Sequence, residues 1–244
     1  AKRLPNMNFY PASDAENYDL LAQSILIGNG FRNGMTVVRP LYAAFLALLH
    51  SIAGNDYMSV TDLQIFVIAL YPLSVYWIGK LIYRGEVGLL AAAWVTWREV
   101  YSIQCTPLVQ VSNVRLLMSD MPTALMVSLI ILAFLLWLRK CEQPSLLMVT
   151  GGLTGLTMLI RTQSAVVIPI ILFFIFYYKK TGHRVLQNCV IFIVSVLIII
   201  VPWNLLNQIN PNLTQPQNTS EENYLLTLFE RIVYEDEELS SRHG

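Results

Sequence analysis

Acidic residues crowd a short polar stretch near the start of the sequence, and they are the first candidates for chemistry. Asp14, Glu16 and Asp19 lie within six residues, just ahead of a long series of apolar segments. A carboxylate can take a proton from a hydroxyl or an amine that attacks another molecule. We favour the interpretation that this stretch holds a catalytic base. The simpler alternative is an exposed loop whose acidic residue caps a surface helix.

Three further charged residues stand beside apolar segments and could act together with these carboxylates: Arg39, Asp120 and Arg161. An arginine guanidinium binds phosphate through two parallel hydrogen bonds. Carboxylates and arginines together suit a lipid-linked phosphosugar, whose phosphate must be held while an acceptor is deprotonated. Each residue also has a simpler explanation, because arginines can extend to lipid headgroups and an aspartate can cap a helix.

The composition indicates an integral membrane protein of the helical type. Of 244 residues, 55% are hydrophobic and only 13% are charged, whereas soluble domains carry about 25% charged residues. The apolar runs are much longer than the ~10-residue strands of a membrane barrel. The formal net charge is zero, which gives no reason to expect nucleic acid as a partner. Phosphate-binding glycine loops, dinucleotide-binding glycine patterns and a Ser/His/Asp set are all absent from the sequence.

The first two segments predict a loop followed by a helix on the membrane surface. Residues 1–37 form a polar loop with a short helix from Asp14 to Ile27, which Gly28-Asn-Gly30 ends. Its apolar residues recur at helical spacing: Tyr18, Leu21, Ala22 and Ile25. Residues 38–54 contain only about ten clean apolar residues, fewer than the ~20 that a membrane span needs. We therefore expect a juxtamembrane helix that lies at the interface.

Residues 55–206 predict a transmembrane bundle of about six spans, followed by a polar, acidic tail over residues 207–244. The apolar segments are Val60–Ile82, Val87–Thr106, Met121–Leu138, Leu146–Ile160, Ala165–Tyr178 and Val185–Leu206. Gly151, Gly152 and Gly155 are most simply positions where two helices pack closely.

The basic loops predict which end of the bundle faces outward. Lysines and arginines between spans stay cytoplasmic, and here they alternate with less basic loops. This alternation puts Asp120, Arg161 and the tail on the outer side of the membrane. Asp14 joins them if residues 38–53 do not cross, and a further span before Ala1 would then be needed. If residues 38–53 do cross, Asp14 is separated from Asp120 by the bilayer.

Several short motifs occur in an order that resembles the polyprenyl-phosphate-dependent glycosyltransferases of the GT-C fold, in the branch of the protein mannosyltransferases and aminoarabinose transferases. The stretch from Asp14 to Ala22 resembles the family's Asp-x-x-x-Tyr-x-x-x-Ala in the first outer loop. Arg39-Pro-Leu-Tyr is similar to the motif that opens its juxtamembrane helix. Later motifs that resemble the family's are Ser119-Asp120, Arg161-Thr162 and Pro202-Trp-Asn-Leu-Leu-Asn207.

The resemblance implies an all-α, polytopic, GT-C-like bundle in the cell (inner) membrane and assigns roles to individual residues. Asp14 would be the catalytic base, assisted by Glu16 or Asp120. Arg39, Arg161 and Tyr18 would bind the lipid phosphate of a polyprenyl-phosphate sugar donor. Asp14 and Asp120 are also candidate ligands of a divalent metal ion, the one cofactor that the resemblance suggests. The expected partners are the donor and membrane lipids.

Two departures from the family favour a different function. Leu206 stands where the family usually has an arginine, and the chain is shorter than most members. The alternative is therefore a truncated or partial member that acts as a non-catalytic structural subunit of a larger membrane complex. A transporter is a weaker third interpretation, because the two halves of the sequence show no inverted repeat.

Overall fold

The computed structural model of the protein describes residues 14–31, 39–54, 56–105, 112–139, 143–178 and 182–209, and every regular element in these ranges is helical. The predicted all-α fold is confirmed. The elements are α1 (Asp14–Leu26), α2 (Pro40–Ala53), α3 (Tyr57–Ile68), α4 (Leu70–Ile82), α5 (Gly85–Cys105), α6 (Asp120–Arg139), α7 (Pro144–Ile160), the 3-10 helix η1 (Thr162–Val166), α8 (Val167–Tyr178) and α9 (Gly182–Ile209).

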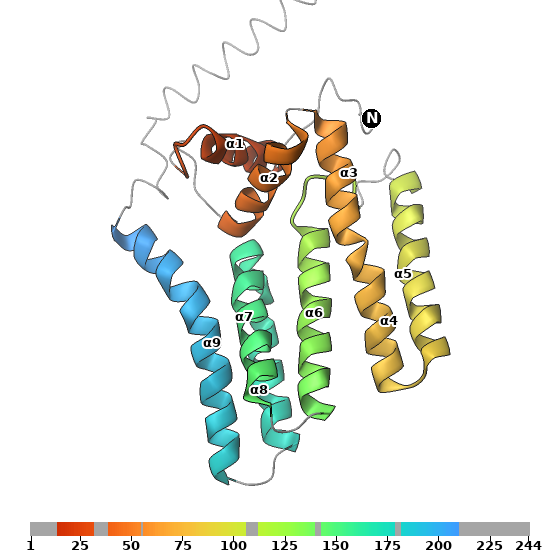
Figure 1. Ribbon diagram of the computed structural model, residues 1–244, viewed down its shortest axis with the longest axis vertical. Helices are drawn as coiled ribbons and strands as arrows, with labels where there is room; N and C mark the ends of the chain where they lie inside the picture. The colour runs from red at the N-terminus through yellow and green to blue at the C-terminus, as the bar shows by residue number, and fades with distance from the viewer. Residues whose placement is uncertain are drawn as a thin grey trace, which may run out of the picture.

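The helices form an upright bundle with two helices placed across one end. Figure 1 shows α3 to α9 running along a common direction, with α1 and α2 over one end of them. Three helical segments of the described chain are long and apolar enough to cross a membrane, namely Tyr57–Ile82, Asp120–Arg139 and Arg184–Leu206. The chain is therefore an integral membrane protein. The count of about six spans stays a prediction.

The helix in the first of these segments is interrupted close to a proline. Helices α3 and α4 follow each other around Ala69, and Pro72 stands three residues later. A proline has no backbone N–H, so Pro72 cannot donate to the carbonyl of Ile68. Together the two helices form one 26-residue segment that is long and apolar enough to cross a membrane, and this segment includes the span predicted from Val60 to Ile82.

Glycines let α7 approach α9 closely, as the sequence predicted for two of the three positions. A Cβ atom added at Gly151 would lie 2.6 Å from the carbonyl oxygen of Phe192, and one at Gly155 would lie 2.8 Å from Cβ of Ile199. The prediction for Gly152 is wrong, because nothing lies within 4 Å of its added Cβ. Gly152 sits on the same helix as the other two, but a methyl group added there would meet open space.

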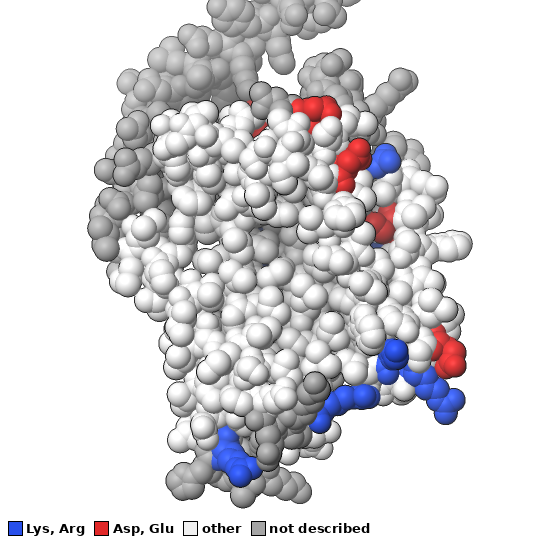
Figure 2. All heavy atoms as spheres, in the orientation of Figure 1, with Lys and Arg blue, Asp and Glu red and all other residues white. Residues whose placement is uncertain are grey.

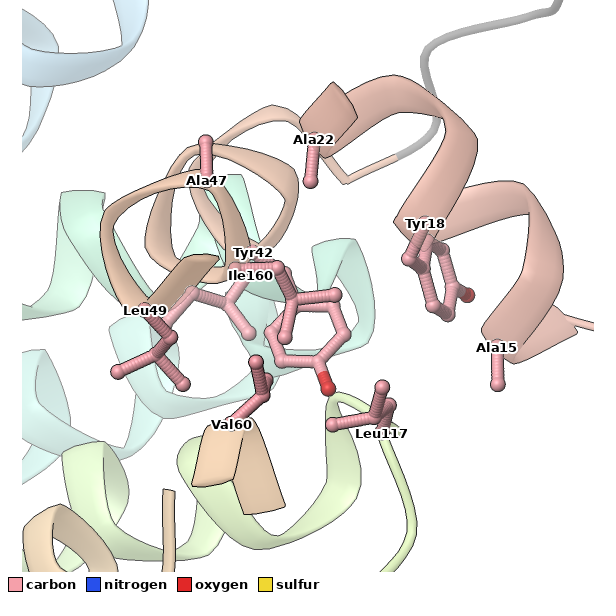
Figure 3. Packing of buried hydrophobic residues seen from close by; sticks show 10 residues of the cluster. Ala15, Tyr18, Ala22, Tyr42, Ala47, Leu49, Val60, Leu117 and Ile160 are labelled. Atoms are coloured by element: carbon pink, nitrogen blue, oxygen red, sulfur yellow. The ribbon is translucent and has the colours of Figure 1, made fainter. Parts of the chain in front are cut away.

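Helices α1 and α2 join the bundle through one apolar cluster. In Figure 3, Tyr42 of α2 lies at its centre, with Tyr18 of α1 facing it and Val60, Leu117 and Ile160 around it. The rings of Tyr18 and Tyr42 meet edge to face, with centroids 5.2 Å apart. Because the cluster draws on α1, α2, α3, α7 and the loop before α6, it fixes α1 and α2 against that end of the bundle.

Charged groups separate between the two ends of the bundle. On the face shown in Figure 2, most blue lysines and arginines lie at the end opposite α1 and α2. At that end Arg139 of α6 donates a hydrogen bond to the carbonyl of Leu81 on α4. This distribution agrees with the basic loops used to predict orientation, although the compartment each end faces stays a prediction.

Some predictions fall at the edge of the described chain. Helix α1 ends at Leu26, and Gly28 and Gly30 follow it with positive φ angles of 86° and 62°, as the glycine stop predicted. Helix α9 continues to Ile209, past the end of its apolar segment at Leu206, and the boundary between bundle and tail stays a prediction. Residues 1–13, 32–38 and 210–244, which include parts of the predicted outer loop and most of the predicted acidic tail, lie outside the described residues.

Candidate functional site

Arg39 is placed at the start of α2 by the proline that follows it. A residue before proline avoids helical backbone angles, and Arg39 has φ −140° and ψ 70° while Pro40 begins the helix. From this position Nη1 of Arg39 donates a hydrogen bond to Oγ of Ser119 at 2.6 Å. Its guanidinium also lies over the ring of Tyr18, 5.1 Å from the centroid. Arg39 thus connects α1, α2 and the start of α6.

The loop before α6 brings Ser119 and Asp120 to this end and is held by a buried glutamine. Gln64 of α3 is fully buried, and its Nε2 donates to the carbonyls of Val114 and Leu116 at 2.7 Å and 2.9 Å. Its Oε1 accepts from the hydroxyl of Tyr42 at 3.3 Å. The buried carbonyls of a loop need such partners, and these bonds fix the residues that lead into α6.

Arg161 sits at a break between α7 and η1. Its backbone is extended, with φ −152° and ψ 111°, and its carbonyl accepts hydrogen bonds from the N–H and the hydroxyl of Ser164. The break turns the arginine toward the start of α6, where its guanidinium forms an ion pair with the carboxylate of Asp120. Both side chains remain partly exposed, at 31% and 30%, so a ligand can still reach them.

Tyr18 lies between these charges. Its side chain is buried against Tyr42, and burial raises the pKa of its hydroxyl. The Asp14 carboxylate, one turn earlier on α1, raises the pKa further, whereas Arg39 and Arg161 oppose the increase. Tyr18 therefore keeps its proton at neutral pH and can donate a hydrogen bond.

Five of the six predicted site residues come together at one end of the bundle. Tyr18 lies under Arg39 and within electrostatic reach of Asp14 and Arg161, and Arg161 pairs with Asp120. Asp14 is exposed at the first turn of α1. The sixth, Glu16, is half-buried on the same helix, and no polar contact from it is found among the described residues. The catalytic and binding roles of all six stay predictions.

Capping of a helix is an incomplete explanation for Asp120 but still applies to Asp14. Asp120 is the first residue of α6, where a carboxylate suits the helix dipole, but its ion pair with Arg161 goes beyond capping. Asp14 begins α1, so a contribution to the helix start stands beside the predicted chemical role.

A buried polar network was missed by the sequence reasoning. Asp19 and His50 are each 3% exposed, and His50 Nε2 lies 2.8 Å from Asp19 Oδ1. The other oxygen of Asp19 accepts from the hydroxyl of Tyr57 at 2.6 Å and from Nε2 of Gln23 at 2.7 Å. A signal existed, because Asp19 interrupts the apolar face of α1, but its partner stands 31 residues away.

The candidate metal site does not fit the described residues. Among them, no three His, Cys, Asp or Glu side chains come close enough together to hold a metal ion. Asp120, one of the two candidate ligands, has its carboxylate engaged by the guanidinium of Arg161. A divalent ion bound by protein oxygens usually takes several of them. We therefore derive no step through a metal ion.

The fold and this arrangement define a class of protein: a helical membrane protein with acidic and guanidinium groups gathered at one end of its bundle. A model of the dolichyl-phosphate-mannose-protein mannosyltransferase family matches residues 37–205, more than half of the chain, and the protein belongs to this family. The match includes Arg39, Asp120 and Arg161, whereas Asp14 and Tyr18 precede it. No curated protein and no solved structure matches the chain.

Membership in this family points to membrane glycosyltransferase activity. The family is one of membrane glycosyltransferases that use a polyprenyl-phosphate-linked sugar donor. The donor and the membrane lipids are therefore the partners that the family implies. These conclusions agree with the resemblance noted in the sequence.

Proposed function

We propose that the protein transfers a sugar from a polyprenyl-phosphate donor to an acceptor on the outer face of the cell membrane, with inversion at the sugar. The observation that supports this most directly is the position of α1. Helix α1 lies at the end of the bundle where α6 begins and α7 ends (Figure 1). Asp14 lies at the same end as Asp120 and Arg161, which supports a common site on one side of the membrane.

In the proposed reaction Asp14 takes the proton from the acceptor hydroxyl or amine. The acceptor atom then forms a bond to the anomeric carbon while the bond from that carbon to the phosphate oxygen breaks. Polyprenyl phosphate leaves with the electron pair of the broken bond. Arg39 and Arg161 carry the positive charge that this phosphate needs, and Tyr18 supplies a hydroxyl donor between them.

Transfer from a labelled polyprenyl-phosphate sugar tests the role of Asp14. Asp14→Asn keeps the size of the side chain and removes its basicity, so turnover should fall at least 100-fold, the usual contribution of a general base. Glu16→Gln is the matched control on the same helix, with a smaller expected loss. Unchanged turnover in Asp14→Asn would remove Asp14 from the chemistry.

A second function, that of a non-catalytic subunit of a larger membrane complex, is favoured by one observation. Both arginines already have partners in the protein, because Arg39 binds Ser119 and Arg161 pairs with Asp120. Charges satisfied in this way can serve structure alone. Purification in fixed stoichiometry with other membrane proteins, together with no transfer by the purified complex, would support this function over the first.

A further inference from the structure

The buried pair of Asp19 and His50 ties α1 to the bundle next to the candidate site. Asp19 lies on α1, His50 near the end of α2, and Tyr57 at the start of α3. Both side chains of the pair are almost fully enclosed, at 4% and 1% exposure. Asp19 immediately follows Tyr18 and lies just over one turn after Asp14. Any movement of Asp19 must therefore move the two candidate site residues with it.

The hydrogen bonds around His50 require a specific charge state. Its Nδ1 lies 2.8 Å from the carbonyl oxygen of Gly54, and its Nε2 lies 2.8 Å from the carboxylate of Asp19. A carbonyl and a carboxylate only accept hydrogen bonds, so both ring nitrogens must donate. Only the imidazolium form has two N–H groups. The neutral ring would leave one nitrogen facing an acceptor without a proton.

In the part of the chain that the structure describes, few other titratable groups face this pair. From α1 the group that faces His50 is Asp19, and from α3 it is Tyr57, whose ring centroid lies 5.7 Å away and whose hydroxyl donates to Asp19. Asp62, the other titratable residue of α3, is exposed. Helix α7, which also packs on α2, contains no titratable side chain. The charge of Asp19 therefore governs His50.

We propose that Asp19 and His50 are positioning residues that hold α1, and with it Asp14 and Tyr18, in place only while His50 is protonated. This proposal rests on the proposed function, which gives Asp14 its role. Neither residue touches the reacting atoms, so their effect on transfer passes through the position of α1. Loss of the proton from His50 removes the positive charge that strengthens its hydrogen bond to Asp19 and leaves one ring nitrogen facing an acceptor without a hydrogen, which loosens α1 from α2.

The direction of the pH effect follows from the way in which the pair shifts the pKa of His50. The hydrogen bond to Asp19 raises the pKa of His50, the Gly54 carbonyl adds to the increase, and burial opposes it. A histidine whose pKa is raised in the folded state stabilises that state at pH values below the ordinary histidine pKa of about 6.5. The stabilisation is lost as the pH rises through the raised pKa. Helix α1 should therefore be held tightly in mild acid and more loosely in alkaline solution.

Hydrogen exchange of the α1 amides tests this directly, without using activity. Protection, measured as the observed rate relative to the intrinsic rate at each pH, should fall for residues 14–26 between pH 6 and pH 9. The amides of α6 serve as the internal reference and should not change. A flat profile for α1 in the wild-type protein would overturn the proposal whatever the variants do.

Substitutions distinguish the loss of the Asp19–His50 pair from a general loss of stability. In His50→Gln a neutral donor remains, so α1 protection at pH 6 should fall roughly tenfold, as expected for loss of one charge-assisted hydrogen bond, and its pH dependence should disappear. Asp19→Asn should act alike, and the double variant should add little more. Asp62→Asn, which changes an exposed titratable residue of α3, is the control and should behave as wild type. Wild-type protection in His50→Gln at pH 6 would contradict the proposal.

Activity gives the second readout. In the wild-type enzyme we expect kcat for transfer to decrease at alkaline pH, because α1 loosens. In His50→Gln this decrease should be absent. The KM for the donor should change less than kcat, because Arg39 and Arg161 remain. A purely structural role would lower the amount of folded enzyme without altering its pH profile. If Asp14→Asn retains turnover while α1 protection still depends on pH, the proposed base is wrong and the positioning pair stands.

Discussion

At the scale of single residues, Arg161 is the best-defined contact of the candidate site. The backbone break that places it follows from its extended conformation, and Asp120 holds its guanidinium. The pair is about one third exposed on both sides, so solvent screens it, and we expect it to contribute about 1 kcal/mol or less to stability. Arg161 therefore matters more for what it can bind than for what it stabilises.

Arg161→Lys should weaken donor binding while leaving the fold unchanged. Lysine keeps the positive charge but lacks the planar pair of donors that matches a phosphate. We expect the KM for the polyprenyl-phosphate donor to rise about tenfold, the loss of one charge-assisted hydrogen bond, with a melting temperature close to wild type. Initial rates at varied donor concentration measure this. Arg98→Lys on α5, which changes an arginine outside the candidate site, is the control, and a similar KM in both variants would argue against phosphate binding by Arg161.

The sequence suggested the residues of the candidate site because charges beside apolar segments stand out in a membrane sequence, and the structure brings several of them to one end of the bundle. Asp14, Arg39, Asp120 and Arg161 all met this criterion. The buried tie between Asp19 and His50 could not be predicted, since it depends on how α1 crosses α2. Neither residue has a partner at helical spacing that reveals the other. A histidine near the end of an apolar helix is compatible with many other surroundings.

At the scale of elements, the loop before α6 shows how a buried side chain can control a site that it does not touch. Gln64→Leu keeps most of the volume but leaves the carbonyls of Val114 and Leu116 without their donor. Each unsatisfied buried group costs roughly 1–3 kcal/mol. We expect a lower melting temperature in detergent and weaker transfer, because Ser119 and Asp120 lose their support. Gln64→Glu tests whether the loss arises from the missing donor, and it should be equally harmful.

The contact between α7 and α9 makes a second prediction for an element. Gly151→Ala places a methyl group 2.6 Å from the Phe192 carbonyl oxygen and 2.7 Å from Cβ of Ser195, so the helices must separate. Overpacking of this kind typically costs about 1–3 kcal/mol. Thermal unfolding in detergent should detect the loss. Gly152→Ala, one residue away, meets nothing within 4 Å and should unfold like the wild type, so equal losses in both variants would show that helix packing is not the cause.

Helix α2 shows which properties of an element can be predicted from the sequence. Its short apolar length predicted a helix that does not cross the membrane with the others, and Figure 1 shows it at the end of the bundle beside α1. Length and flanking charges are local properties that a sequence displays. The edge-to-face contact between Tyr18 of α1 and Tyr42 of α2 depends on packing and is visible only in the structure.

At the scale of the whole molecule, the arrangement predicts that the two ends of the bundle face different compartments. Helix α1 and the Asp120–Arg161 pair share one end, and the blue basic residues in Figure 2 gather mainly at the other. Basic ends of membrane bundles stay cytoplasmic. The site end should therefore be reached from outside, where a lipid-linked sugar and its acceptor would meet.

Single cysteines and a membrane-impermeant thiol reagent test this orientation in intact cells. In a background with the natural cysteines replaced by serine, Asn17→Cys on α1 should react from outside, because Asn17 is exposed at the site end. Ser145→Cys, exposed at the start of α7 on the opposite end, should react only after the membrane is permeabilised. Labelling of both positions from outside would mean that the bundle does not span as predicted. Labelling of Ser145→Cys alone would place Asp14 in the cytoplasm and exclude a transfer reaction on the outer face.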